Sequence, residues 1–428
     1  MFCQLEVLRQ CFPPSVRRIL EELPDSLDET YERILKEIRK PNQVHAQKLL
    51  QCLVTAVRPL RVAELAEVLA FDFKAEGIPK LNLGWRWQDQ EEAVMSACSS
   101  LVIIVKDGDL RIVQFSHFSV KEFLTANRLA EPVRDVSRYH IRLDAAHTIL
   151  AQACLGVLLR LDDHIDRDNI ESFPLARYAA QYWDTHARFE NASSRIKDGM
   201  ECLFDEDKPH FATWLWIYNK DRGGSSMATT YPEKPDAVPL YYAAGLGFRD
   251  LAEHLISKYP EHVNARGGLE ETPMRFAALG GYVDILSLLL EHGAHVDGRG
   301  IGNTTPLHLA SIAGKVEAGQ FLLDRGADIN NRDTDDWTPL FWTAFKRQVE
   351  FARMLLKRGA RIDVPDKHDG QTALHRAVIM EDIQFIRLLL EHGADVNAHT
   401  KDGETPARFT RQQEIIELLS EYGAKSVE

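Results

Sequence analysis

Cysteine is scarce in this chain of 428 residues, and long apolar runs are missing from it. The cysteines form no Cys-x-x-Cys pair, so neither a zinc ribbon nor a disulfide framework is indicated. They are Cys3, Cys11, Cys52, Cys98, Cys154 and Cys202. The most apolar internal run, 148–161, is interrupted by Gln152 and Arg160 and is too short to span a bilayer. The first residues also lack the apolar core of a signal peptide. We therefore expect buried free thiols in a reducing compartment and a soluble, cytoplasmic protein.

Positive charge is also in short supply. Lys and Arg number 51 against 64 Asp and Glu, which gives a net charge of −13. The residues up to Asp236 include 30 basic and 36 acidic side chains, and the remainder include 21 and 28, so both halves are acidic. Neither half supplies the positive field that attracts phosphate groups. We expect no nucleic acid and no membrane among the partners.

The second half of the chain is repetitive. A Thr-Pro or Thr-Ala pair recurs at spacings of 33, 33, 34 and 33 residues, beginning at Thr272, Thr305, Thr338, Thr372 and Thr405. Gly-Ala pairs follow at Gly293, Gly326, Gly359, Gly393 and Gly423. This period and content resemble the ankyrin repeat. Thr is a good N-cap and Pro suits the first helical position, so each pair predicts the start of a helix.

We count six such repeats over 237–428. The first departs from the pattern, with Val238 in place of Thr, and the last is shortened, so both are typical of capping repeats. In the fourth, Phe341 and Trp342 replace the usual His-Leu pair. Since one repeat cannot bury its own apolar faces, we expect the stability to come from stacking.

The ankyrin resemblance implies that partners bind at the hairpin tips and along the exposed face of the first helices. Carried over position by position, it selects Ile312, Trp337, Phe345, Lys346, His368, Gln371, Ile379 and Met380. Apolar side chains at exposed positions are typical of interaction sites. We therefore predict that a protein partner buries a Trp337–Phe345–Met380 ridge and that acidic rims set its choice. The alternative is that Trp337 and Phe345 pack against one another or a neighbouring hairpin.

The first half predicts a winged-helix domain over 44–130. Helical stretches lead to two short apolar runs, 101–105 and 110–115, which are joined by the Asp-Gly of a tight hairpin. Ser26 and Glu29 have capping-box spacing at the start of one helix, and Ser119 and Glu122 have it at the start of another. The region 131–218 predicts a helical connector, and the residues 219–236, rich in Gly, Ser and Pro, predict a flexible linker.

The stretches LPDSLDETYERIL, RPLRVAELAEVLA and FSHFSVKEFL, together with FPLARYAAQYW, resemble the fungal NACHT–ankyrin proteins, a group of NLR-like signal-transducing ATPases. The resemblance implies that 1–43 is the end of a NACHT module. The expected fold is thus mainly α: a helical and winged-helix half followed by an ankyrin solenoid of about six repeats.

The phosphate loop of that family is missing. Its Gly-Lys-Ser/Thr ending has no match, since Gly314-Lys315 is followed by Val316 inside a repeat. ATP binding cannot be carried over, and the chain is expected to be either a core-less relative or an incomplete gene product. We predict no catalytic, cofactor-binding or metal-binding residues, and a non-enzymatic adaptor or sensor.

Two other functions stay open at this stage. A winged helix suggests a DNA-binding regulator, although the candidate recognition helix, 91–99, has two Glu and no basic residue. Asp162, Asp163 and Asp166 have the spacing of a DDxxD motif, which would suggest a magnesium-dependent enzyme acting on diphosphates, but a solvated surface loop explains them more simply. His140 and His147 fall near one helical face without a metal-binding motif.

Overall fold

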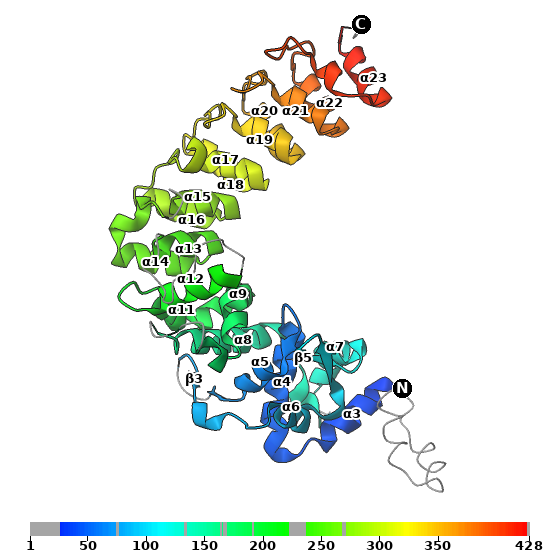
Figure 1. Ribbon diagram of the computed structural model, residues 1–428, viewed down its shortest axis with the longest axis vertical. Coiled ribbons are helices and arrows are strands. Elements are labelled where there is room, and N and C mark those ends of the chain that lie inside the picture. Colours follow the sequence, from blue (N-terminus) through cyan, green and yellow to red (C-terminus); the bar gives the residue numbers. More distant parts are fainter. Residues whose placement is uncertain are drawn as a thin grey trace. The chain divides into compact units, whose positions relative to one another are not determined.

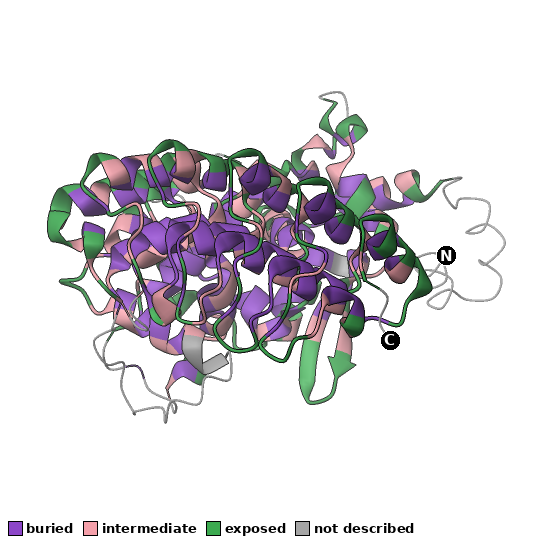
Figure 2. Ribbon diagram, turned by 90° about the horizontal axis from the view of Figure 1, so that it is seen from above, coloured by how far each residue is buried: buried purple, intermediate pink, exposed green. Residues whose placement is uncertain are grey.

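The computed structural model forms two compact units, Met1–Lys234 and Pro235–Glu428, and both are mainly helical (Figure 1). It describes residues 26–73, 77–131, 135–162, 165, 169–190, 192–221, 237–267 and 271–425. The mainly α fold class is confirmed. In both units the buried residues gather where helices meet, and the exposed ones lie on loops and outward faces (Figure 2).

The first unit begins with a winged-helix domain. Its helices are α3 (Leu27–Glu37), α4 (Gln43–Thr55), α5 (Val62–Val68), α6 (Gln90–Cys98) and α7 (Phe118–Thr125), and its sheet contains β1 (Leu60–Arg61), β4 (Val102–Asp107) and β5 (Leu110–Phe115). The sheet is antiparallel in the order β1-β5-β4, with Val102 opposite Phe115. The predicted hairpin is confirmed, and Gly108 adopts the left-handed conformation that its turn requires. A second hairpin, β2 (Phe71–Asp72) with β3 (Lys80–Leu81), was not predicted, because two-residue strands leave no periodicity to detect.

The two predicted helix caps have different outcomes. Ser26 caps α3 by accepting a hydrogen bond from the Glu29 amide, as predicted. The prediction for Ser119 was wrong: the cap of α7 is His117, whose ring accepts from the Ser119 amide. The Ser119 hydroxyl instead lies 2.8 Å from the Tyr31 hydroxyl, which ties α3 to α7.

The rest of the first unit is helical, as expected for the connector. It contains α8 (Leu143–Leu158), α9 (Ala176–Ala187), α10 (Ala192–Arg195), α11 (Lys197–Leu203) and α12 (His210–Asp221). Its core is aromatic: the ring of Trp183 lies 5.9 Å from Phe204 and 5.8 Å from Trp214. The linker was predicted over 219–236, but α12 continues to Asp221, because its helical turns extend past the predicted boundary; residues 222–236 lie outside the described residues.

The expected buried thiols are found at Cys52, Cys98 and Cys154, whereas Cys202 is half-buried; all four are free. Burial raises the pKa of Cys52 and of Cys98 to about 12, because the thiolate loses its hydration. Cys3 and Cys11 lie outside the described residues.

The second unit stacks six helix pairs in sequence order, as predicted (Figure 1). They are α13 (Pro239–Leu246) with α14 (Arg249–Lys258), α15 (Pro273–Gly280) with α16 (Val283–Glu291), α17 (Pro306–Ala313) with α18 (Val316–Asp324), α19 (Pro339–Lys346) with α20 (Val349–Lys357), α21 (Ala373–Ile379) with α22 (Ile383–Glu391), and the short 3₁₀ helix η11 (Pro406–Phe409) with α23 (Gln413–Glu421). The first helices pack against one another more closely than the second helices do. Small side chains allow this approach, since the buried alanines Ala243, Ala277, Ala310, Ala344 and Ala377 lie along the row.

Buried histidines join successive repeats. The Nδ1 atom of His308 accepts from the Thr305 amide at 3.1 Å, so Nε2 carries the proton and donates to the Trp337 carbonyl oxygen at 3.0 Å. His375 repeats this arrangement with Thr372 and Glu404. Burial lowers the pKa of His308 to about 4, because an imidazolium there would lose its hydration.

This histidine predicts a pH-dependent stability. In the unfolded chain the pKa of His308 returns to about 6.5, so between about pH 6.5 and pH 4 the unfolded chain binds a proton that the folded chain does not. The free energy of unfolding should therefore be full above pH 6.5 and fall as the pH drops toward 4, by roughly 2–3 kcal/mol from this residue. Urea unfolding of wild type and His308→Gln at pH 7.5 and 4.5 measures it. The loss on acidification should be smaller in the variant, and equal losses would contradict the assignment.

Candidate protein-binding site

Four aromatic side chains of the fourth repeat form one cluster, which we call the ring cluster: Trp337, Phe341, Trp342 and Phe345. Trp337 lies in the loop before α19, and the other three lie on α19. The ring of Trp337 is 4.7 Å from those of Phe341 and Trp342 and 5.4 Å from that of Phe345. Phe341 is buried, whereas the other three are only partly covered. The cluster therefore offers apolar surface that is already held in place.

The carboxylate of Asp333 holds the ring of Trp342 and the backbone of Trp337. It accepts the backbone amide of Trp337 and the indole N–H of Trp342, each at 2.8 Å. Burial raises the pKa of Asp333, and these hydrogen bonds oppose the rise. The Trp342 ring cannot turn away without breaking its hydrogen bond to a buried carboxylate, and the Trp337 ring packs against it, so the surface is preorganised.

Arg376 of the fifth repeat lies over the ring cluster. Its guanidinium carbon is 5.7 Å from the ring centre of Trp337, 5.6 Å from that of Phe341 and 5.5 Å from that of Phe345. Cations are attracted to the faces of such rings. Within the described residues, the buried Nε atom of Arg376 and the buried Nε1 atom of Trp337 have no hydrogen-bond partner.

The first helices of the fourth and fifth repeats are followed by unusual backbone. In the third repeat Gly314 ends α17 in the left-handed conformation, with φ of 67°. The matching residues are Arg347, with φ of 57°, and Glu381, with φ of 53°. Side chains other than glycine pay about 1–2 kcal/mol for this conformation. The Arg347 guanidinium donates to the Met380 carbonyl oxygen and so joins the two repeats.

The residues predicted from the sequence lie along this same stretch of first helices and hairpins. Ile312, Trp337, Phe345, Ile379 and Met380 are half-buried, Lys346 and His368 are exposed, and Gln371 is buried. Trp337 and Phe345 do contact one another, as the packing alternative expected, yet both keep exposed surface. The ring of His368 is 2.9 Å from the carboxylate of Asp335, and the side-chain oxygen of Gln371 has no partner within the described chain.

The sequence analysis did not select Phe341, Trp342 or Arg376 for this site. A signal was present: Arg376 follows Thr372 by four residues, as Trp342 follows Thr338. That position faces the neighbouring repeat, so aligning the two repeats would have placed a cation beside the rings.

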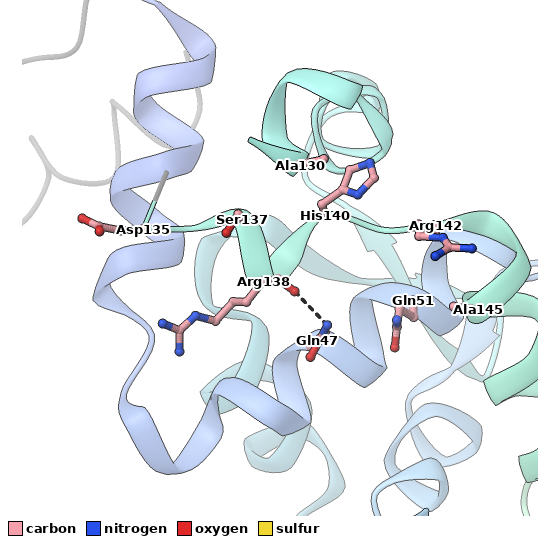
Figure 3. A pocket seen from close by; sticks show the side chains of 9 residues that line it. All are labelled: Gln47, Gln51, Ala130, Asp135, Ser137, Arg138, His140, Arg142 and Ala145. Atoms are coloured by element: carbon pink, nitrogen blue, oxygen red, sulfur yellow. Dashed lines mark hydrogen bonds between the residues drawn. The ribbon is translucent and has the colours of Figure 1, made fainter. Parts of the chain in front are cut away.

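A polar pocket lies in the first unit, where α4 meets the segment before α8 (Figure 3). It has a volume of about 680 Å³ and is lined by Gln47, Gln51, Ala130, Asp135, Ser137, Arg138, His140, Arg142 and Ala145. Gln47 donates to the Arg138 carbonyl oxygen at 2.7 Å, and Arg142 forms an ion pair with Asp144. These contacts hold the wall of the pocket and bring no nucleophile and base together.

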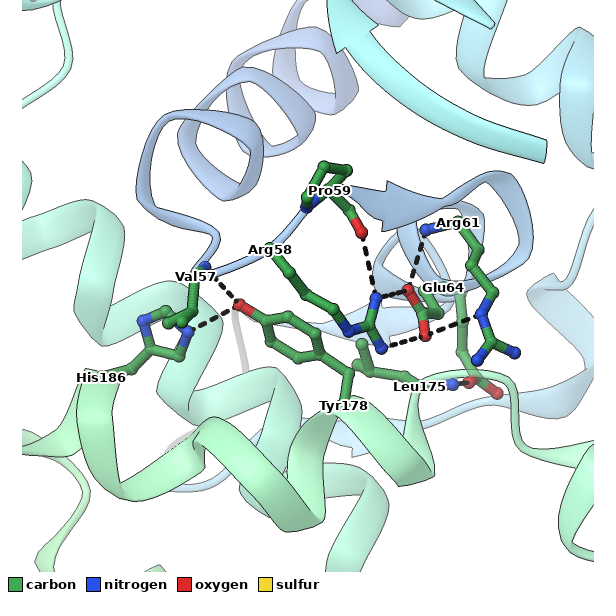
Figure 4. Close-up of polar contacts among 9 residues, drawn as sticks. Val57, Arg58, Pro59, Arg61, Glu64, Leu175, Tyr178 and His186 are labelled. Carbon is green, nitrogen blue, oxygen red and sulfur yellow. Dashed lines mark hydrogen bonds and ion pairs between the residues drawn. The ribbon is translucent and has the colours of Figure 1, made fainter. Parts of the chain in front are cut away.

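A chain of hydrogen bonds connects the winged-helix domain with the connector (Figure 4). The Val57 amide donates to the Tyr178 hydroxyl at 3.1 Å, and this hydroxyl is 2.9 Å from Nε2 of His186. The other nitrogen of His186 lies 2.9 Å from a ring nitrogen of His147. Burial lowers the pKa of His186 to about 3, so the ring is neutral and serves as a structural link. His147 therefore pairs with α9, while His140 precedes α8.

Two buried carboxylates strengthen the same junction. Glu64 accepts two hydrogen bonds from the Arg58 guanidinium, at 2.8 and 2.7 Å. Glu67 accepts the Leu175 amide at 2.7 Å and pairs with Arg86. Glu67 thus holds the domain to the connector directly, whereas Glu64 holds Arg58, whose guanidinium lies over the ring of Tyr178 (Figure 4).

The other predicted chemistries gain no support from the described residues. Asp163 and Asp166 of the DDxxD-like run lie outside them, and the Asp162 carbonyl accepts a hydrogen bond from Thr213. Across the ranges that the structure describes, no group of three or more His, Cys, Asp or Glu is placed to hold a metal ion. Within those ranges, no helix combines the length and apolarity needed to cross a bilayer. The candidate DNA-recognition helix corresponds to α6, in which Glu91 forms an ion pair with Arg111 of the β4–β5 hairpin.

Comparisons with known proteins identify both folded parts. Residues 240–333, 301–366 and 331–402 match a family model of ankyrin repeats. Residues 31–133 match the model described as the winged helix domain of GPI inositol-deacylase. The chain therefore contains ankyrin repeats and a winged-helix domain.

A relative of known name covers a large part of the chain. It is the azaphilone pigments biosynthesis cluster protein L of Monascus ruber, which is 32% identical over 291 residues. The match covers 64% of this chain and 60% of that protein, so the chain spans less than two thirds of its relative. Among solved structures, the ankyrin repeat domain of Bcl-3 is similar, with 26% identity, a TM-score of 0.42, and coverage of 45% of this chain and 89% of that one.

The ring cluster predicts that two substitutions in the fourth repeat differ in their effect on the stability of the chain. Trp337→Ala removes contacts with three rings and should lower the free energy of unfolding by about 1–3 kcal/mol, below the cost for a fully buried Trp. Lys346→Ala removes an exposed side chain and should change it by less than about 0.5 kcal/mol. Urea unfolding of both variants measures this, and equal stabilities would show that the cluster is not packed as described.

Proposed function

We propose that the chain is a non-catalytic adaptor or sensor that binds a protein partner through the first helices and hairpins of its third to fifth ankyrin repeats. The ring cluster is the observation that carries this proposal. It combines partly exposed aromatic side chains, which often dominate protein interfaces, with ring-to-ring contacts and a hydrogen bond from Trp342 to Asp333 that limit their movement. Ile312, Ile379 and Met380, which are also partly exposed, extend the apolar surface into both neighbouring repeats.

The non-catalytic part of the proposal rests on how the buried titratable groups are used. Glu64 and Glu67 hold arginines and backbone amides, and His308 and His375 hold caps and carbonyls. Each is engaged in a structural contact. A general acid or base would instead need access to a substrate.

A role in NLR-like signalling is the finer part of the proposal. Its support is the resemblance of the first unit to the region that follows the ATPase core in NACHT–ankyrin proteins. The junction around Tyr178 and Glu67 makes the winged-helix domain and connector one block, which is suited to docking onto a core supplied by another chain. The relative is named for a biosynthesis cluster, so proteins encoded beside this gene are the first candidates for partners.

Site-specific photo-crosslinking tests the binding face. A photoreactive residue in place of Lys346, which is exposed at the end of α19, should crosslink a partner in the native host; the same residue in place of Lys357, which is exposed at the end of α20, is the matched control. The partner is then identified by mass spectrometry and purified. Its Kd for the chain should rise about tenfold or more with Phe345→Ala. Equal crosslinking from both positions, or an unchanged Kd, would contradict the proposed face.

A further inference from the structure

The cations around the ring cluster differ from several others in their unit. Arg275, Arg358 and Arg408 each form an ion pair with an Asp or Glu. Lys346 and Arg376, by contrast, have no carboxylate partner within the described ranges: Lys346 lies 4.9 Å from the ring centre of Phe345, and Arg376 lies over three rings.

Neighbouring groups that could neutralise this charge are engaged elsewhere. The carboxylate of Glu381, next to Met380 in the chain, accepts a hydrogen bond from Gln412 of the sixth repeat. Arg347 adds a third positive charge and donates to the Met380 carbonyl oxygen. Positive charges on Lys346, Arg347 and Arg376 therefore lie around the ring cluster, beside the Asp333 carboxylate, within a unit that carries 29 acidic and 21 basic residues.

The two buried hydrogen-bonding groups of the ring cluster and Arg376 that lack a partner within the described ranges are both donors. Trp337 Nε1–H and Arg376 Nε–H are donors, both are buried, and neither has a partner in the described part of the chain. An unpaired buried donor destabilises the free chain. The planar guanidinium suits a carboxylate, whose two oxygens can accept two parallel hydrogen bonds.

We propose that the ring cluster and Arg376 recognise an acidic residue, Asp or Glu, flanked by apolar residues in a segment of the protein partner. The inference rests on the proposed function, since it names the chemistry of the partner at the same site. The carboxylate pairs with the guanidinium of Arg376, and the apolar neighbours cover Phe345 and Met380.

The hairpin tips restrict the choice further. They carry Asp335, Asp336 and Asp369, of which Asp336 is paired with Arg332 and Asp335 contacts His368. These carboxylates disfavour a continuous acidic run, so the site selects one acidic residue at a fixed position.

A displayed library of short random peptides is the probe. Peptides are selected on the intact wild-type chain, and those that no longer bind the Trp337→Ala variant are kept as cluster-dependent peptides. We expect these peptides to share one Asp or Glu between apolar residues. If no cluster-dependent peptide is recovered, both the proposed binding face and this inference are contradicted.

The pairing is then tested on both sides. Arg376→Gln should raise the Kd of such a peptide about tenfold or more, and the peptide's own Asp→Asn or Glu→Gln change should do the same. The two changes combined should cost little more than either alone, because they remove the same interaction. Arg376→Lys keeps the charge without the planar fork and should give an intermediate Kd.

Arg387→Gln is the matched control, since it removes the same charge from an exposed position on α22 of the same repeat and should change the Kd less than about twofold. Cluster-dependent peptides without a shared acidic position, or a Kd unchanged by Arg376→Gln, would overturn the inference while leaving the proposed binding face intact. Should Arg376→Gln lower the melting temperature strongly, the acid-to-amide change in the peptide still decides the question on the wild-type chain.

Discussion

Each ankyrin repeat has two apolar faces and can cover neither alone, and the second unit depends on this constraint. The buried alanines bring the first helices close, and His308 then ties the third repeat to the backbone of the fourth, as His375 ties the fifth to the sixth. Packing is thus satisfied inside the stack. The side chains at the outer edge of the first helices are not needed for stacking, and in the fourth repeat that edge carries aromatic rings.

The sequence predicts what is periodic or local and misses what depends on contact between distant segments. The Thr caps and the Asp-Gly turn depend on a few adjacent residues, and the 33-residue period can be read directly from the sequence. The repeats and the hairpin were therefore predicted. Arg376 and the ring cluster meet across two repeats, and the pairing of Ser119 with Tyr31 spans 88 residues. A capping pattern alone could not show that the Ser119 hydroxyl has a distant partner.

The first unit is held by polar contacts as well as by its core. Contacts such as Glu67 with Leu175 and Val57 with Tyr178 link segments more than a hundred residues apart. Removing one member would strand a buried charge or hydroxyl, which costs more than a lost surface contact. This explains why buried acidic residues can persist in a domain for which no reaction is proposed.

The left-handed residue that follows the first helix in each of the first five repeats bears on which side chains that position accepts. At Gly314 an added Cβ would approach only the side-chain end of Gln348, which is flexible, so a larger residue there meets little rigid obstruction. Arg347 shows that a long cationic residue is accommodated at the equivalent place at a modest conformational cost. Exchanging this single residue can therefore change the charge at the edge of a repeat without redesigning its interior.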